Sequence, residues 1–149
     1  MTLAAVADST VLIGLERIGH LDVLRAVFSP LFVPPEVYVE FGVKVSWLVV
    51  VEYSDKALFG ALCESVDVGE AAAMTRAHEK NLPVILDDLQ ARSTGRRIGL
   101  TITGTLGVLI RAKRNGIITK TRPILDELDQ AGFYLDNTLR EEALRLAGE

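Results

Sequence analysis

Short apolar runs that end at acidic residues alternate with helical patterns along most of this chain. Residues 3–7 are apolar and stop at Asp8, which indicates a buried strand with a polar tip. A second such run, at residues 83–86, stops at the pair Asp87–Asp88. The other predicted strands, from short apolar or Val-rich runs, are residues 32–33, 47–52 and 100–103.

Between these runs the apolar residues recur at helical spacing. From residue 11 to residue 27 the pattern predicts one helix, and a pair of prolines at residues 34–35 opens the next, because proline is tolerated in a first helical turn. Residues 104–107 read as a turn that leads into a helix ending near residues 115–116. The remaining predicted helices are part of 55–65, then 67–80, 89–98, 122–131 and 138–147.

This order of elements indicates the fold class. Alternating strands and helices are typical of a parallel sheet with helices on both faces, so we predict a three-layer α/β/α domain with a mostly parallel central sheet. The 149 residues suffice for one domain with a substantial core. We expect a single domain over residues 1–149, with a core at about 1–103 and a helical C-terminal extension at about 104–149.

Composition narrows the class of protein. With 49% hydrophobic and 24% charged residues the chain is globular, not disordered. Its longest uncharged stretch, residues 98–110, is well short of the ~20 apolar residues that span a bilayer, so we expect no membrane anchor and no signal peptide. Cys63 is the only cysteine, which rules out an intrachain disulfide and fits a reducing cytoplasm.

The net charge of −4 argues at first against a nucleic-acid partner. The charge is uneven, however, because eight basic residues fall within one short stretch. They are Arg92, Arg96, Arg97, Arg111, Lys113, Arg114, Lys120 and Arg122. An acidic domain can therefore still present a basic stripe to a phosphate backbone.

Acidic residues stand where strands end or helices begin: Asp8, Glu40, Glu70 and Asp87–Asp88. If the fold brings them together, their carboxylates repel one another, and Mg²⁺ or Mn²⁺ relieves that repulsion. Two such ions ~3.5–4 Å apart can clamp the attacking and leaving oxygens of a phosphodiester. Ser9 or Thr10 could bind a metal water or a phosphate. The alternative is structural, since acids also cap helices and stabilise their dipoles.

Four segments resemble the motifs of PIN domains, in the same order. They are Ala-Asp8-Ser-Thr after a hydrophobic strand, Val-Tyr-Val-Glu40-Phe, Asp-Val-Gly-Glu70-Ala-Ala-Ala, and Val-Ile-Leu-Asp87-Asp88-Leu-Gln-Ala-Arg. The tail at residues 102–116 is similar to a PIN-like subgroup of prokaryotes whose domain continues into C-terminal helices. The resemblance covers essentially the whole chain.

The resemblance implies a Mg²⁺- or Mn²⁺-dependent ribonuclease, which cleaves RNA. Many relatives are the toxins of toxin–antitoxin pairs. By motif match the catalytic acids would be Asp8, Glu40, Glu70 and Asp88, with Asp87 as the alternative to Asp88 among the metal ligands. An antitoxin partner and a homodimer are further expectations from the resemblance. Arg92, Arg96 and Arg97, which follow Asp88 on the same predicted helix, are the candidate phosphate-binding residues.

Two departures from the family pattern leave an alternative open. Leu86 stands where a threonine often precedes the last acid by two residues, and Glu70 replaces the commoner aspartate. Either favours a PIN-like module that binds nucleic acid or protein without cleaving. A phosphoacceptor domain is a third hypothesis, but its usual acidic pair follows the first strand, whereas here the pair comes late.

Overall fold

The computed structural model of the chain describes residues 2–149. Within them, five parallel strands form one sheet in the order β3-β2-β1-β4-β5. The strands are β1 (Leu3–Ala7), β2 (Phe28–Val33), β3 (Leu48–Val50), β4 (Val84–Ile85) and β5 (Ile102–Thr103). The predicted three-layer α/β fold with a parallel sheet is confirmed.

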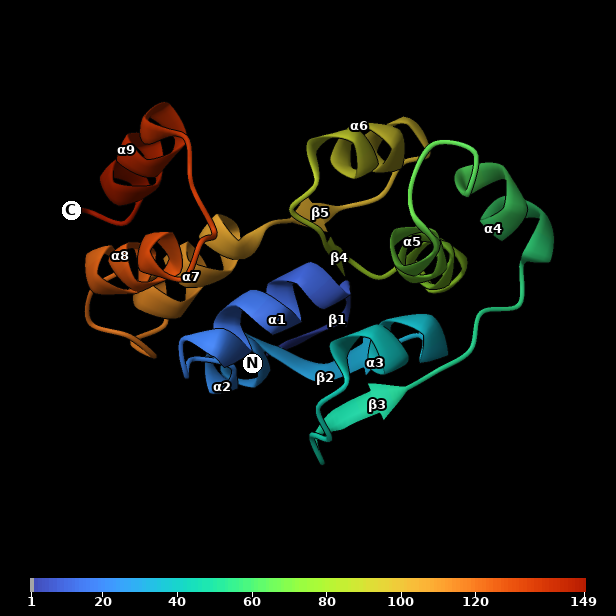
Figure 1. Ribbon diagram of the computed structural model, residues 1–149, viewed down its shortest axis with the longest axis horizontal. Helices are drawn as coiled ribbons and strands as arrows, with labels where there is room; N and C mark the ends of the chain where they lie inside the picture. Colours follow the sequence, from blue (N-terminus) through green and yellow to red (C-terminus); the bar gives the residue numbers. More distant parts are fainter. Residues whose placement is uncertain (1) are drawn as a thin grey trace.

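Helices pack on this sheet and on one another (Figure 1). They are α1 (Ser9–Arg17), α2 (Asp22–Val27), α3 (Pro35–Phe41), α4 (Lys56–Leu62), α5 (Val68–Lys80), α6 (Leu89–Arg97), α7 (Thr105–Arg114), α8 (Arg122–Gln130) and α9 (Asn137–Leu146). Helix α5 lies along β1 and β4 and also contacts α3 and α4. Helix α2 packs on β2 and α7, and α7 packs on β5 and α9.

The chain reverses direction across the sheet at its centre. From β1 it continues to β2 and β3 on one side, and it later returns to β4 and β5 on the other. The neighbours β1 and β4 therefore form the switch point, where an open α/β sheet usually binds its ligand beyond the carboxyl ends of the strands. Asp8 follows β1 and Asp87–Asp88 follow β4, so both acidic segments lie at this switch point.

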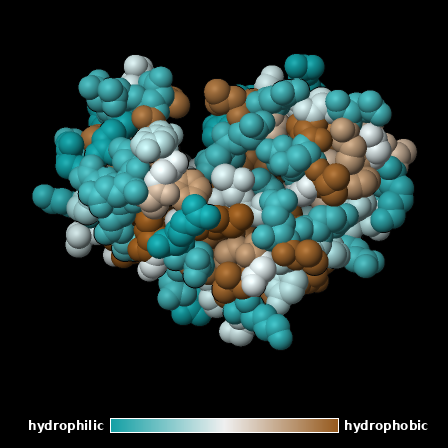
Figure 2. Space-filling model, in the orientation of Figure 1, coloured by the Kyte–Doolittle hydropathy of each residue, from teal (hydrophilic) through white to brown (hydrophobic). Residues whose placement is uncertain are grey.

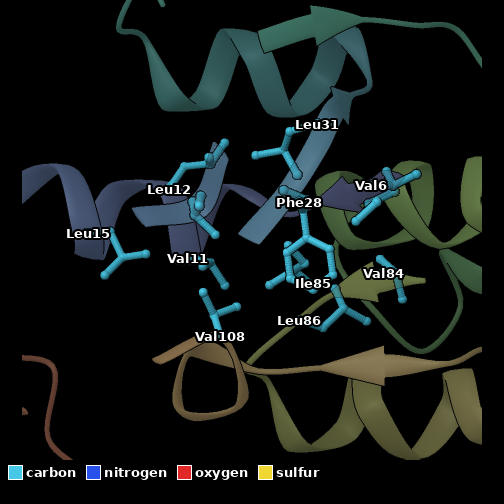
Figure 3. Close-up of a cluster of buried hydrophobic side chains, with 14 of the residues drawn as sticks. Val6, Val11, Leu12, Leu15, Phe28, Leu31, Val84, Ile85, Leu86 and Val108 are labelled. Carbon is cyan, nitrogen blue, oxygen red and sulfur yellow. The ribbon is translucent and has the colours of Figure 1, made fainter. Parts of the chain in front are cut away.

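The core is built from the side chains of the central strands and of the helices beside them (Figure 3). Phe28, Leu31 and Ile85 are almost fully buried, as are Leu12 and Leu15 of α1. Removing such side chains from water stabilises the fold by roughly 1.5–3 kcal/mol each. This burial fixes β1 and β4 rigidly, and with them the polar residues at their ends.

Several predicted boundaries were wrong. The single helix expected over residues 11–27 is two helices, because Gly19 adopts a left-handed conformation (φ 75°) and the His20 N–H returns to the Leu15 carbonyl at 2.8 Å. Residues 104–107 are not a turn, since α7 begins at Thr105. Strand β2 begins four residues earlier than expected, and β3 to β5 are shorter than their apolar runs.

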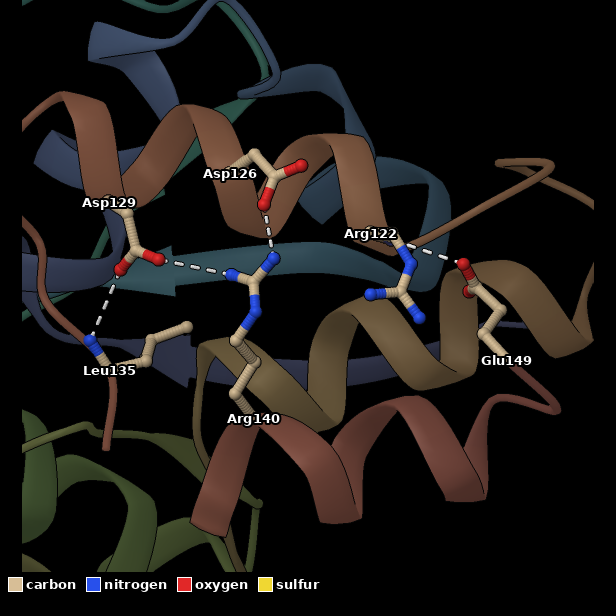
Figure 4. Close-up of polar contacts among 6 residues, drawn as sticks. All are labelled: Arg122, Asp126, Asp129, Leu135, Arg140 and Glu149. Carbon is tan, nitrogen blue, oxygen red and sulfur yellow. Dashed lines mark hydrogen bonds and ion pairs between the residues drawn. The ribbon is translucent and has the colours of Figure 1, made fainter. Parts of the chain in front are cut away.

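The helical extension is tied together by ion pairs (Figure 4). Arg140 of α9 binds both Asp126 and Asp129 of α8. Glu149, after α9, accepts hydrogen bonds from the backbone N–H groups of Thr121 and Arg122 at the start of α8. Helices α8 and α9 thus hold one another through charged side chains at both ends.

Among residues 2–149, no helix combines the length and the apolar character that crossing a membrane requires.

Candidate active site

Asp8 is the centre of the candidate site. Its backbone N–H donates to the Ile85 carbonyl at 3.1 Å, which continues the pairing of β1 with β4 by one residue. Its side chain is only 3% exposed. One carboxylate oxygen, Oδ1, is buried without a hydrogen-bond partner among the described residues. Such a group is costly to bury, so its position calls for a ligand or a proton.

Gly69 keeps the space beside this oxygen open. It lies in the first turn of α5, and a Cβ placed on it would stand 3.5 Å from Asp8 Oδ1. The same Cβ would stand 3.7 Å from Oδ1 of Asp67, the residue that caps α5. The start of α5 therefore lies directly against Asp8, and the missing side chain of Gly69 leaves room between two carboxylate oxygens and the Val37 side chain, whose Cγ2 would also stand 3.7 Å from that Cβ.

Glu70 lies in the same first turn of α5 and takes part in capping that helix. Asp67 accepts a hydrogen bond from the Glu70 N–H at 2.8 Å, and Glu70 Oε1 accepts one from the Asp67 N–H at 3.1 Å. This reciprocal pair is a capping box. Glu70 thus caps α5, as the structural alternative predicts. The residue is only 7% exposed, and its carboxylate is also repelled by the charges of Asp67 and Asp88.

Glu40 reaches the site from α3. The buried Ser9 donates its hydroxyl hydrogen to Glu40 Oε1, and these two residues are 31 positions apart in the chain. Glu40 itself is exposed, so it lies at the solvent side of the site. Ser9 therefore orients one of the predicted catalytic acids.

Electrostatics place these acids in one cluster. Burial is the largest cause that raises the pKa of Asp8 from 3.8 to about 7; the Ser9 backbone opposes it, and the charges of Glu70, Asp67 and Glu40 add to it. Burial likewise raises the pKa of Glu70 from 4.5 to about 7, with Asp67 and Asp88 contributing repulsion. The charges of Glu40 and Glu70 thus act on Asp8, and the charge of Asp88 acts on Glu70.

Asp87 and Asp88 have separate roles in the structure. Asp87 accepts from the backbone N–H of Thr105 at 2.8 Å and from its hydroxyl at 2.6 Å, so it joins the end of β4 to the start of α7. Asp88 caps α6 through the Ala91 N–H at 2.9 Å and is exposed. The charge of Asp88 therefore acts on Glu70, whereas the Asp87 carboxylate is engaged by Thr105.

The donor set fits a hard divalent cation. In the part of the chain that the structure describes, no three His, Cys, Asp or Glu side chains already converge as a ready metal cage. The unpartnered Asp8 Oδ1, however, lies next to Gly69, and the charges of Glu70, Asp67 and Glu40 act on the Asp8 carboxylate. Oxygen donors of this kind are the ligands that Mg²⁺ and Mn²⁺ prefer, and a cation would offset their mutual repulsion.

A groove begins beside the acids. It has a volume of about 940 Å³ and is lined by residues of α6, of α7 and of the segment from α8 to α9. Thr10, Arg92 and Arg96 line it, whereas Arg97 does not. The three arginines predicted to bind phosphate thus separate into two that face a common hollow and one that does not.

Sequence reasoning missed the roles of four residues in this region. Asp67 was read only as a helix start, although its spacing to Glu70 is that of a capping box, which places both carboxylates together. Thr105 gave no signal, because its partner Asp87 is 18 positions away. Arg111 and Arg114 were part of the basic stretch, but only the folded chain brings them into the groove with Arg96.

Comparison with known proteins identifies the family. A family model described as a PIN domain matches residues 4–149, which is nearly the whole chain. No curated protein matches the chain. PIN domains are in general nucleases that use divalent metal ions, and the family model supports a nuclease-like module of this kind. With the motifs in order, the parallel sheet and the acids at its switch point, the chain belongs to the PIN domain family.

Proposed function

We propose that this protein is a metal-dependent endoribonuclease that hydrolyses RNA phosphodiesters. The observation that carries the proposal is the buried Asp8 carboxylate at the switch point, with one oxygen unpartnered and other acids around it. Buried ionisable groups with perturbed pKa values are concentrated at functional sites. The family supports nuclease chemistry, and RNA is the substrate class we infer from the motif resemblance.

Asp8, Glu70 and Asp88 are the residues that would hold Mg²⁺ or Mn²⁺. When bound, such an ion supplies positive charge for the transition state and lowers the pKa of a water molecule. Release of Glu70 from the Asp67 N–H would free its carboxylate for this role. Asp88 can contribute one oxygen while the other caps α6.

The remaining residues orient the substrate. The Ser9 hydroxyl fixes the Glu40 carboxylate at the solvent side, where it can accept a proton from an incoming water. Arg92 and Arg96 on α6 face the adjoining groove and can bind substrate phosphates. Thr10, exposed at the start of α1, offers a hydroxyl in the same hollow.

The test is cleavage of a mixed pool of single-stranded and structured RNA in Mn²⁺, Mg²⁺ or EDTA. We expect cutting with either metal, none in EDTA, and loss of cutting in Asp8→Asn. The matched control is Asp22→Asn, which makes the same chemical change at an exposed residue that, among residues 2–149, forms an ion pair with Arg25 alone. Cutting that persists in Asp8→Asn, or that is equal in EDTA, contradicts the proposal.

The second candidate is a PIN-like module that binds nucleic acid or protein without cleaving. It is favoured by the capping box, which engages Glu70 at the helix start, and by Leu86 in place of the usual threonine. Metal binding measured by titration, together with no cutting by the wild-type protein, would favour this function over the nuclease.

The biological setting is a further part of the proposal. We infer a cytoplasmic toxin that is held inactive by an antitoxin protein and that forms a homodimer. Exposed valines at the edge strand support a protein partner: Val49 and Val50 of β3 are 41% and 44% exposed, and an open strand edge invites association. Sedimentation of the purified protein would show the dimer, and co-purification from its native host would show an antitoxin.

A further inference from the structure

The Arg92 side chain folds back across the turn that carries both aspartates. Its Nη1 donates a long hydrogen bond, 3.4 Å, to the carbonyl oxygen of Leu86, the residue before Asp87. Its backbone N–H donates to the Asp88 carbonyl at 2.9 Å in the first turn of α6. One half-buried residue thus binds the chain on both sides of the turn, at Leu86 and at Asp88.

Gly104, at the start of α7, makes room for the Arg92 guanidinium. A Cβ on Gly104 would clash with Arg92 Nη1, and it would stand 2.8 Å from Asp87 Oδ1 and 3.4 Å from the Leu86 carbonyl oxygen. The φ of Gly104 is −99°, which any residue adopts, so close packing and not backbone conformation explains the glycine. The guanidinium, the Asp87 carboxylate and the end of β4 therefore meet over this buried residue.

Two other elements hold the same turn. The Leu86 N–H donates to the Thr103 carbonyl of β5 at 2.9 Å, and both carboxylate oxygens of Asp87 accept from Thr105. Asp88 uses one oxygen to cap α6 and is exposed. Fixing Leu86 and Asp87 therefore fixes the backbone from which the Asp88 side chain projects.

We propose that Arg92 is a positioning residue of the nuclease site. By binding the Leu86 carbonyl it holds the turn that carries Asp88, and Gly104 provides the space that its guanidinium needs. This role rests on the proposed nuclease function and goes beyond the phosphate binding considered for Arg92. One nitrogen turns to the backbone, while the residue also lines the groove.

Arg96, one turn further along α6, is the contrasting case. Both arginines line the groove, which Figure 2 shows as a notch between the α6 side and the α9 side of the molecule. Arg96 is exposed, whereas Arg92 is half-buried. A residue that only binds substrate phosphates changes the affinity for RNA and its salt dependence. A residue that holds a metal ligand in place changes the affinity for the metal itself.

The test is therefore Mn²⁺ binding in the absence of RNA, followed by titration calorimetry. Loss of an outer hydrogen bond at a metal site typically weakens metal binding 10–100-fold, so Arg92→Ala should weaken it about tenfold or more. The sign is decisive, because removal of a nearby positive charge would by itself make Mn²⁺ bind more tightly. Arg96→Ala should leave Mn²⁺ binding as tight as in the wild type or tighter. It should also reduce the salt slope of RNA binding by about 0.7–0.9.

Gly104→Ala is the second variant, because it keeps every charge and displaces the guanidinium. It should also weaken Mn²⁺ binding. The double variant with Arg92→Ala should be impaired less than the product of the two single effects, since both break the same contact. Gly60→Ala in α4, where the added Cβ lies in open space, is the control and should bind Mn²⁺ as the wild type does. Urea denaturation shows that each variant is folded, and Arg92→Ala alone decides if Gly104→Ala is not.

Unchanged or tighter Mn²⁺ binding in Arg92→Ala overturns the positioning role, and so do single effects that simply multiply in the double variant. Weaker Mn²⁺ binding in both variants, with no RNA cutting by the wild type, supports the positioning role and refutes the nuclease. Cutting that depends on Asp8, with wild-type Mn²⁺ affinity in both variants, supports the nuclease and refutes the positioning role. A wild-type protein that binds no Mn²⁺ refutes both.

Discussion

Thr105 binds Asp87 twice, through its backbone N–H at 2.8 Å and through its hydroxyl at 2.6 Å. This contact joins the end of β4 to the start of α7, so the helical extension is attached directly at the switch point. Asp88, the next residue, turns instead toward α6 and acts on Glu70. Of these two adjacent aspartates, Asp87 therefore has a structural role and Asp88 is the candidate catalytic residue.

Replacing each aspartate should separate these roles. Asp87→Ala leaves the Thr105 N–H and hydroxyl without their acceptor and should lower the free energy of unfolding by about 1–3 kcal/mol. Asp88→Asn keeps an oxygen to cap α6, so the same free energy should change by less than about 0.5 kcal/mol, while cleavage falls by about 100-fold. Urea denaturation and RNA cleavage measure the two effects. The reverse pattern would make Asp87 the metal ligand.

Asp8→Asn should stabilise the metal-free protein while removing its activity. The buried carboxylate has an oxygen without a partner, and neutral asparagine removes the cost of burying that charge, about 1–3 kcal/mol. Thermal unfolding in EDTA at neutral pH should therefore give a higher Tm for the variant. Addition of Mn²⁺ should raise the Tm of the wild type and leave that of Asp8→Asn unchanged. A lower Tm of the variant in EDTA would show that the buried Asp8 carboxylate does not destabilise the metal-free protein.

Gly69→Ala should separate space from charge at the site. The new methyl would lie 3.5 Å from Asp8 Oδ1, which is an ordinary contact for a folded protein but occupies the space beside the free oxygen. Alanine favours the helix by about 1 kcal/mol over glycine, so the fold should be as stable or more stable. Metal-dependent cleavage should fall about tenfold or more, in proportion to the lost space around the ligand.

The control for this variant is Gly60→Ala in α4, where no atom lies within 4 Å of the added Cβ. It should gain similar helix stability and keep full cleavage. Equal activity in Gly69→Ala and Gly60→Ala would mean that the space beside Asp8 is not used.

Glu149 should stabilise the helical extension in a pH-dependent way. Burial alone would raise the pKa of its carboxyl, but hydrogen bonds from Thr121, Lys113 and the Arg122 N–H outweigh it and lower the pKa to about 2. Because the folded-state pKa is depressed, the folded protein favours the charged form. This stabilisation is complete above the ordinary value of 4.5 and is lost as pH falls toward 2.

Glu149→Gln tests this dependence. At pH 7 the variant should be less stable than the wild type by about 1–2 kcal/mol in urea denaturation. The difference between the two proteins should shrink as the pH is lowered through the interval from 4.5 to 2. Glu142→Gln is the control, because Glu142 is exposed and its ion pair, within the described part of the chain, is to Arg145. A difference that stays constant with pH would contradict the depressed pKa.

The sequence by itself determined the fold class and the places where the acids would stand. Apolar runs that end at Asp8 and at Asp87–Asp88 predicted buried parallel strands with polar tips, because burial and strand periodicity are written in consecutive residues. The prolines at residues 34–35 marked the start of α3 correctly for the same local reason. The family resemblance, confirmed by the match over residues 4–149, followed from the order of these local motifs.

Other contacts could not be predicted from the sequence, because the two residues that form each contact are far apart in the chain. The hydroxyl of Ser9 meets Glu40 31 positions later, and Thr105 meets Asp87 across 18 positions. Local periodicity cannot say which of two adjacent aspartates turns toward which helix. Likewise Arg96, Arg111 and Tyr134 share a groove only after α6, α7 and the segment after α8 have packed.

Tertiary structure also decides how much free energy it costs to keep each carboxylate ionised. Nothing in the sequence distinguishes Asp8 and Glu70 from the many acidic residues on the surface of this protein. In the folded chain, however, burial raises the pKa of each to about 7. The physical reason is that a pattern of residues fixes which side chains prefer the interior, whereas desolvation and charge repulsion depend on distances that only the folded chain sets.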